Sequence, residues 1–274
     1  MDVSPTTRNE REAPRAEGGE TQQPPAPWQS VRLVERTVRR YHANSIGRNA
    51  HASDGTAASG VPEKDGEPSA ALFDRLFAVA PCVAGHGLRV AALSYALAVS
   101  HTTTARLASS SLLLGALFHD FGKVFLPHEY LHFARPLDAA EWKAMHAHPH
   151  LGADYLRVRN DGLSREALLV IAQHHERHDG RGYPLGLAGR DISPRAALVS
   201  VADAYIAMRE HRAYANRRSH HDAIAELQAC SGTQFHSQFV DILAAMPASV
   251  AEQAVALLPR SPCENIIQEI AHAV

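Results

Sequence analysis

The stretch HHERHDGRGYP, residues 174–184, concentrates side chains that could bind a metal ion. His174 and His175 are adjacent, Glu176 follows, and a further histidine and an aspartate come next. Neutral imidazole and carboxylate groups are the ligands that borderline metals such as Zn, Fe, Mn and Ni accept in proteins. Glycines and a closing proline then allow a tight turn close to these groups. The stretch predicts a ligand-bearing helix that ends in a shaped loop beside a metal site.

Candidate ligands of the same kind stand elsewhere in the chain, each against an apolar segment. His119 and Asp120 follow the apolar run 112–118, and Asp203 lies inside the apolar run AALVSVADAYIAM. A lone buried His-Asp pair is ordinarily a hydrogen bond that closes a helix end, because an unpaired buried carboxylate is costly. Several such groups together instead predict a shared site, in which two metal ions bridged by a carboxylate would satisfy their lone pairs. The candidate ligands are His86, His119, Asp120, His148, His174, His175 and Asp203.

Composition limits the class of protein. The chain has 274 residues, a formal net charge of −2 and 45% hydrophobic residues, as in an ordinary globular protein. Its balanced charge gives no broad electrostatic footprint for a nucleic acid polymer or a membrane surface. The three cysteines are far apart and lack metal-type spacing, which indicates reduced thiols in a cytoplasmic protein. We expect no transmembrane helix, because no run of about 18 apolar residues is evident, and no signal peptide.

The chain divides into a polar tail and a helical domain. Residues 1–69 are predicted to be mostly disordered tail and linker, because they bury too little apolar surface to offset the entropy of ordering. Within them, residues 28–42 have the spacing of a short amphipathic helix with a basic face, which would dock on the domain or on a partner. Residues 70–274 are predicted to form one catalytic domain.

Apolar residues recur at three- and four-residue intervals through that domain, and no alternating run predicts a strand. Abundant Ala and Leu favour helices, and Thr, Asp, Ser and Pro mark several helix starts. We therefore predict an all-α fold. The predicted helices cover residues 71–79, 87–99, 103–118, 138–146, 152–159, 165–175, 194–209, 221–229, 235–245 and 250–258.

The order and spacing of these motifs resemble a known family. His86, His119-Asp120 and Asp203 follow the pattern of the HD phosphohydrolase superfamily, whose four ligands hold one metal. Adding the histidine of HPHLG and the stretch HHERHDGRGYP makes the chain similar to the HD-GYP subfamily, the cyclic di-GMP phosphodiesterases of bacteria. The resemblance runs from about residue 86 to residue 219 and includes RVA, HDFGK, VADAY and RAY in the family's order.

The resemblance implies a role for each matching residue. One metal would be held by His86, His119, Asp120 and Asp203, and Asp120 would bridge to the second metal. That second metal would be held by His148, His174 and His175. Lys123 would face the scissile phosphate, so Asp120 and Lys123 are the expected catalytic residues. The expected substrate contacts are Lys123, Asp179, Gly182, Tyr183, Pro184 and Arg212.

The implied protein is an HD-domain helical bundle that opens cyclic di-GMP to pGpG, and further to GMP, with a water activated by two divalent metals. Histidine-rich ligation favours Fe, Mn or Ni over Mg. The implied partners are cyclic di-GMP and GGDEF-domain proteins, with no nucleic acid polymer.

Three departures from the family pattern leave alternatives open. Cys82 stands where some members have a glutamate that binds a third metal, so we expect two metals. Ile206 and Ala215 replace residues that are commonly acidic and basic. These changes favour, as an alternative, a weakly active or inactive signalling module that binds cyclic di-GMP or a GGDEF-type partner. A hydrolase for another cyclic dinucleotide is a third reading. Among nearby residues, Glu176 is expected to orient a histidine.

Overall fold

A computed structural model describes residues 76, 79–131, 135–159, 163–210 and 217–256. The predicted tail and its helix at 28–42 therefore lie outside the described residues. Arg212 and Ala215 lie outside them as well.

The described residues form helices joined by short turns, and no strand occurs among them, which confirms the predicted all-α fold. Four short 3-10 turns connect the α-helices, at Ala105–Leu107, Phe121–Phe125, His128–Leu131 and Gly189–Asp191. The α-helices are α3 (Pro81–Val99), α4 (Ser110–Leu117), α5 (Ala139–Met145), α6 (His148–Arg159), α7 (Arg165–Gln173), α8 (Pro194–Arg209), α9 (His220–Ala229), α10 (Ser237–Ala245) and α11 (Ala248–Val255).

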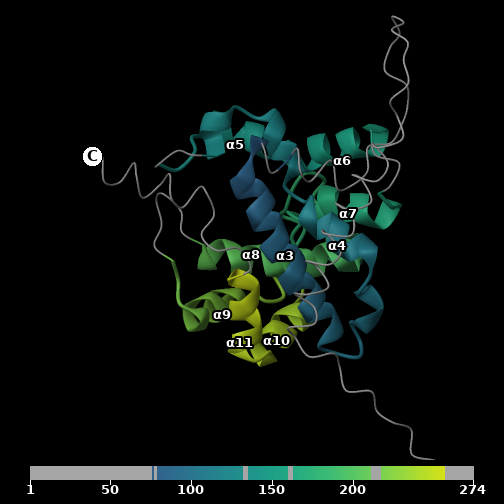
Figure 1. The fold of residues 1–274 in the computed structure, drawn as a ribbon, viewed down its shortest axis with the longest axis vertical. Coiled ribbons are helices and arrows are strands. Elements are labelled where there is room, and N and C mark those ends of the chain that lie inside the picture. The colour runs from purple at the N-terminus through teal and green to yellow at the C-terminus, as the bar shows by residue number, and fades with distance from the viewer. Residues whose placement is uncertain (1–75, 77–78, 132–134, 160–162, 211–216, 257–274) are drawn as a thin grey trace, which may run out of the picture.

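Helix α3 lies at the centre of the bundle and packs against α4, α8 and α11 (Figure 1). Its length and a mean hydropathy of 1.4 would suit a membrane-spanning helix, so the expectation that no segment is long and apolar enough was too broad. However, 83% of that window is buried inside the protein, as in any core helix packed on several sides. The hydrophobicity of α3 is therefore explained by its place in the core.

One predicted helix is divided in two. The expected helix at 103–118 is a 3-10 turn followed by α4, because Ser109 lies in an extended conformation and caps α4 by accepting a hydrogen bond from the Leu112 amide. Other predicted starts are observed. Ser164 caps α7, and Asp138 forms a capping box with Glu141 at the start of α5.

Two glycines allow the backbone segments that carry ligands to approach each other closely. A Cβ added at Gly87 in α3 would lie 2.2 Å from the Leu117 carbonyl oxygen at the end of α4. A Cβ added at Gly122 would lie 1.8 Å from the His148 carbonyl oxygen in α6. Both neighbours are backbone atoms, so neither can move aside as a side chain would. These contacts bring α3 and α6 against the segment that follows α4.

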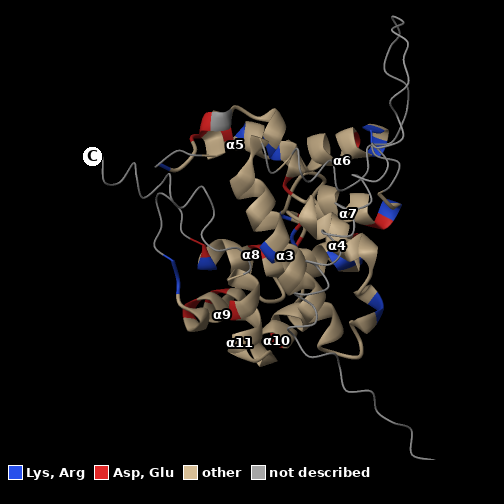
Figure 2. Ribbon diagram, in the orientation of Figure 1, with Lys and Arg blue, Asp and Glu red and all other residues tan. Residues whose placement is uncertain are grey.

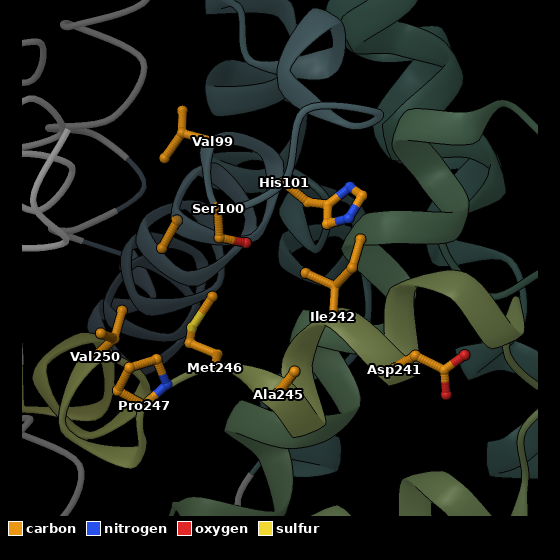
Figure 3. Close-up of a pocket in the computed structure, with 10 residues that line it drawn as sticks. Val99, Ser100, His101, Asp241, Ile242, Ala245, Met246, Pro247 and Val250 are labelled. Atoms are coloured by element: carbon orange, nitrogen blue, oxygen red, sulfur yellow. The ribbon is translucent and has the colours of Figure 1, made fainter. Parts of the chain in front are cut away.

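Charged residues are spread over the described fold, and one apolar pocket lies away from these contacts. Figure 2 shows Lys, Arg, Asp and Glu scattered over many elements of the described fold. An apolar pocket of about 460 Å³ lies between the end of α3 and helices α10 and α11, lined by Val99, Ile242, Met246 and Val250 among others (Figure 3). None of the candidate metal ligands lines this pocket.

Replacing Gly122 with alanine is expected to destabilise the protein by about 1–3 kcal/mol, because the new methyl group overlaps the His148 carbonyl. Chemical denaturation followed by circular dichroism measures the loss. Lys143→Ala, on the exposed face of α5, serves as the control and should change stability by less than about 0.5 kcal/mol. Equal stability of the Gly122 variant and the wild type would show that the two segments are not in contact.

Candidate metal centre

The structure brings the seven predicted ligands together in two adjoining groups. Asp120, His148, His174 and His175 form one group, and the ligand atoms within it lie within 4.8 Å of one another. The same limit holds for the second group, which consists of His86, His119 and Asp203.

Most of these side chains come from the ends of helices. His119 and Asp120 directly follow α4, His148 begins α6 just after α5 ends, and His174 is the C-cap of α7. Only His86, in the second turn of α3, and Asp203, in α8, come from helix interiors.

One backbone device orients three of the histidines. The Nδ1 atoms of His119, His148 and His174 lie 2.7, 2.7 and 2.8 Å from the carbonyl oxygens of Ala116, Met145 and Ile171, each three residues earlier. Those carbonyls belong to the last turns of α4, α5 and α7, where carbonyls have no partner within the helix. Because a carbonyl only accepts, each Nδ1 carries a proton and donates it.

The opposite nitrogens therefore present lone pairs to one another. Burial lowers the pKa of His148, and it lowers the pKa of His174 to about 4, so both imidazoles are neutral at pH 7. Their Nε2 atoms, which are then acceptors, lie only 3.2 Å apart. The His148 Nε2 also lies 3.2 Å from the Oδ1 atom of Asp120. Lone pairs at such distances repel unless a cation lies among them.

Asp120 lies between the two groups of ligands. Its Oδ1 faces His148 and also lies 3.7 Å from the Nε2 atom of His174, whereas its Oδ2 lies 3.4 Å from the Nε2 atom of His119. Burial alone would raise the pKa of Asp120, but Lys123 and His119 outweigh it and hold the pKa well below its usual value. This arrangement has the form of a bridging carboxylate.

Two buried atoms at this point have no hydrogen-bond partner. They are the Nε2 atom of His119 and the Oδ1 atom of Asp120. An unpaired buried polar atom is costly and rare in folded proteins, so it requires an explanation. Metal ions on the imidazole and carboxylate lone pairs would supply it, and the donor set suits borderline divalent metals. The residues present therefore fit a pair of metals.

Glu210, which no sequence motif singled out, lies next to the second group. Its Oε2 atom is 2.9 Å from the Nδ1 atom of His86, and its Oε1 atom accepts a hydrogen bond of 2.8 Å from the buried Arg89. A carboxylate that accepts from the far nitrogen of a metal-binding histidine fixes the ring and raises its basicity. Glu210 thus orients the His86 ring, as backbone carbonyls orient the rings of His119, His148 and His174.

His86 also lies 2.9 Å from Asp203 through its Nε2 atom, so two carboxylates contact one imidazole. Burial would lower the pKa of His86, but Glu210 and Asp203 outweigh that effect and raise the pKa to about 10. The metal-free protein therefore keeps a proton on this ligand at neutral pH.

The loop after His175 is held by Glu176. The two carboxylate oxygens of Glu176 accept hydrogen bonds of 2.7 and 2.9 Å from the amides of Leu185 and Leu187. The expectation that Glu176 orients a histidine is therefore wrong, because both oxygens are used to close the loop. The loop includes a cis peptide bond between Tyr183 and Pro184. Gly182 packs directly against the backbone of Arg177, since an added Cβ would lie 2.3 Å from the Arg177 amide nitrogen.

The other predicted substrate contacts fall into different places. Lys123 lies beside the centre, with its Nζ atom 2.6 Å from the Oδ2 atom of Asp120. Asp179 forms a two-bond ion pair with Arg177 and also accepts from the Arg181 amide, so its carboxylate is engaged within the loop. Its contact with substrate stays a prediction, as does that of Arg212, which lies outside the described residues. Ile206, a departure from the family pattern, is fully buried in the hydrophobic core.

Comparison with known proteins adds a family match. A family model described as an HD domain matches residues 70–238, which is more than half of the chain. A solved structure, that of Bd1817, an HDG"Y"P protein from Bdellovibrio bacteriovorus, superposes with a TM-score of 0.50. The two proteins are 20% identical, and the superposition covers 79% of this chain and 68% of the other, so it supports the fold alone.

Curated relatives match part of the chain. The "3'3'-cGAMP-specific phosphodiesterase 2" of Vibrio cholerae is 35% identical over 125 residues, 46% of this chain and 24% of the relative. The "Cyclic di-GMP phosphodiesterase response regulator RpfG" of Xanthomonas campestris is 35% identical over 130 residues, 47% of this chain and 34% of the relative. The "Cyclic di-GMP phosphodiesterase" of Thermotoga maritima is 31% identical over 132 residues, 48% of this chain and 36% of the relative. The matched segments span about a quarter to a third of these relatives' lengths.

Changing Glu210 to glutamine is expected to weaken binding of the metal at His86 by about 10- to 100-fold, because the imidazole loses its charged acceptor. Competition with a metal-sensitive dye measures the affinity. Glu226→Gln is the matched control, because Glu226 is exposed and pairs only with Arg218 in the described contacts. Unchanged metal affinity in the Glu210→Gln variant would show that Glu210 does not support metal binding at His86.

Metal binding is expected to release about one proton from His86 at pH 8, because an imidazole with a pKa of about 10 must lose its proton to coordinate. An ordinary histidine, with a pKa near 6.5, would release almost none at that pH. The number of protons released on metal binding should fall as pH rises through 10, because His86 is then already deprotonated. In the metal-free fold, the stabilisation from charged His86 is complete below pH 6.5 and is lost over the same rise. Calorimetry in two buffers with different ionisation enthalpies counts the protons.

Proposed function

This chain belongs to the HD domain family, and we propose that it is a metal-dependent phosphodiesterase that hydrolyses cyclic di-GMP to pGpG. The observation that carries the proposal is the convergence of imidazole lone pairs on the buried carboxylate of Asp120, where two ligand groups adjoin. The names of the curated relatives support a cyclic dinucleotide as the substrate.

The metals would be held by the two groups of ligands, with Asp120 between them. When bound, two divalent ions supply Lewis acidity and an activated water for displacement at phosphorus. Five of the seven ligands have pKa values shifted in the direction that favours metal binding: burial lowers the pKa of His148, His174 and His175, and neighbouring groups hold the pKa of Asp120 and Asp203 low. The protein therefore offers a nearly preorganised ligand set, except for the proton on His86.

Lys123 provides the cation for the substrate. Its side chain is 23% exposed, whereas that of Asp120 is 5% exposed, so Lys123 can be reached from solvent while still contacting the centre. A positive group beside the reacting phosphate stabilises the charge that develops during displacement. We assign Lys123 to that role and Asp120 to holding both metals.

We propose Fe, Mn or Ni as the metals in preference to Mg, because five of the seven ligands are imidazoles and Mg prefers oxygen. Further hydrolysis to GMP, a cytoplasmic location and association with GGDEF-domain proteins stay predictions.

A second substrate is favoured by one specific observation. The match to a relative named as specific for 3'3'-cGAMP is as strong in identity as the match to RpfG, at 35% in both cases. The choice between two cyclic dinucleotides depends on contacts with the bases, which the metal centre does not make. The weakly active signalling module is a further alternative and differs from both enzymes in lacking turnover.

Wild-type protein purified without oxygen and loaded with Mn²⁺ or Fe²⁺ is expected to convert cyclic di-GMP to pGpG, and Asp120→Ala to lose both bound metal and hydrolysis. Lys123→Gln should keep the metals but slow hydrolysis by about 100-fold, as loss of a transition-state contact does elsewhere. Lys143→Gln, on the exposed face of α5, is the matched control. Products are identified by liquid chromatography with mass spectrometry.

Parallel reactions with 3'3'-cGAMP separate the two substrates. Faster turnover of 3'3'-cGAMP would replace cyclic di-GMP in the proposal. Metal-loaded protein that binds either nucleotide without cleaving it would favour the signalling module and refute the enzyme.

A further inference from the structure

One of the five histidines in the centre differs from the others in how its ring is held. His119, His148 and His174 donate from Nδ1 to carbonyls, and His86 contacts Glu210 through Nδ1. For His175, the described part of the chain offers neither ring nitrogen a hydrogen bond. A metal-binding histidine usually needs such a partner to fix its plane and its tautomer. The ring of His175 must therefore be held in another way.

A close aromatic contact takes that place. The Tyr183 ring lies 4.7 Å from the His175 ring, centroid to centroid, with an angle of 31° between the planes. Tyr183 also stacks on His146, at 4.0 Å and 20°. The contact with His146 is stacked and that with His175 is tilted, and close packing on both faces restricts rotation of the rings. Tyr183 thus links His146 at the surface to His175 in the group that also contains Asp120, His148 and His174.

His146 is well anchored for this purpose. It is the C-cap residue of α5, whose first turn is fixed by the Asp138–Glu141 capping box. Glu141 further accepts two hydrogen bonds of 2.7 Å from Arg135. The other end of the stack is fixed too, because Glu176 closes the loop that carries Tyr183.

We propose that His146 is a positioning residue of the metal centre: through Tyr183 it fixes the plane of His175, the histidine ligand whose ring receives no hydrogen bond from the described residues. The inference rests on the proposed metal site and assigns to His146 a role that needs its ring face and no ligand atom. His146 is exposed, so its replacement should leave the fold intact.

Binding of Mn²⁺ to purified, metal-stripped protein tests the proposal by calorimetry, with activity as a separate readout. His146→Ala should weaken the site that contains His175 by about 10-fold while leaving the other site unchanged. His146→Phe keeps an aromatic face without a nitrogen and should restore the affinity. His150→Ala, an exposed histidine of α6, is the matched control and should bind as the wild type does.

A double-mutant cycle shows whether His146 acts through Tyr183. Tyr183→Ala should produce the same loss, and His146→Ala added to it should cause no further loss. Additive losses, an unaffected His146→Ala variant or failure of His146→Phe to rescue would overturn the inference. Wild-type protein that takes up a single metal would overturn it as well. Protein that binds two metals but cleaves no cyclic dinucleotide would refute the proposed function alone, because the affinities of the variants still decide the role of His146.

Discussion

The buried carboxylate of Asp120 is the constraint on which the rest of the structure depends. It shares its surroundings with the Nε2 lone pairs of His119, His148 and His174, at 3.2 to 3.7 Å, and its Oδ1 has no hydrogen-bond donor. Such an arrangement is costly in the absence of a cation. The packing of the helices around α3 holds it in place. Stability supplied by the core therefore maintains a site that would be unfavourable by itself.

Much of this could be predicted from sequence because the ligands contrast with their surroundings. His119, Asp120 and Asp203 each stand against apolar runs, where a polar side chain requires a partner. Helix periodicity also placed most helices, because α7 and α8 carry clear starts at Ser164 and Pro194. The split at Ser109 had a visible signal, three serines in a row, but the apolar pattern on both sides concealed it.

Other features had no local signal. Glu210 lies in the sequence MREHR, which is typical of an exposed helix end, and only the tertiary fold brings it to His86, 124 residues away. The buried Arg89 that pairs with Glu210 belongs to the RVA motif of the family resemblance, but nothing in that motif pointed to Glu210 as its partner. Glu176 was expected beside a histidine because it adjoins two of them, whereas loop geometry turns it toward the amides of Leu185 and Leu187. Partners that orient ligands are thus harder to find than the ligands themselves.

The repeated contact from a histidine to the carbonyl three residues earlier has a consequence for engineering. Because the acceptor is backbone, no side-chain substitution at Ala116, Met145 or Ile171 can delete it. Substitutions at these buried positions would change packing but leave the acceptor that sets the tautomer of the ligand in place. The same histidine placed just past the last turn of an unrelated helix would inherit a defined orientation. The orientation of these three histidines therefore depends on where their helices end, more than on the side chains around them.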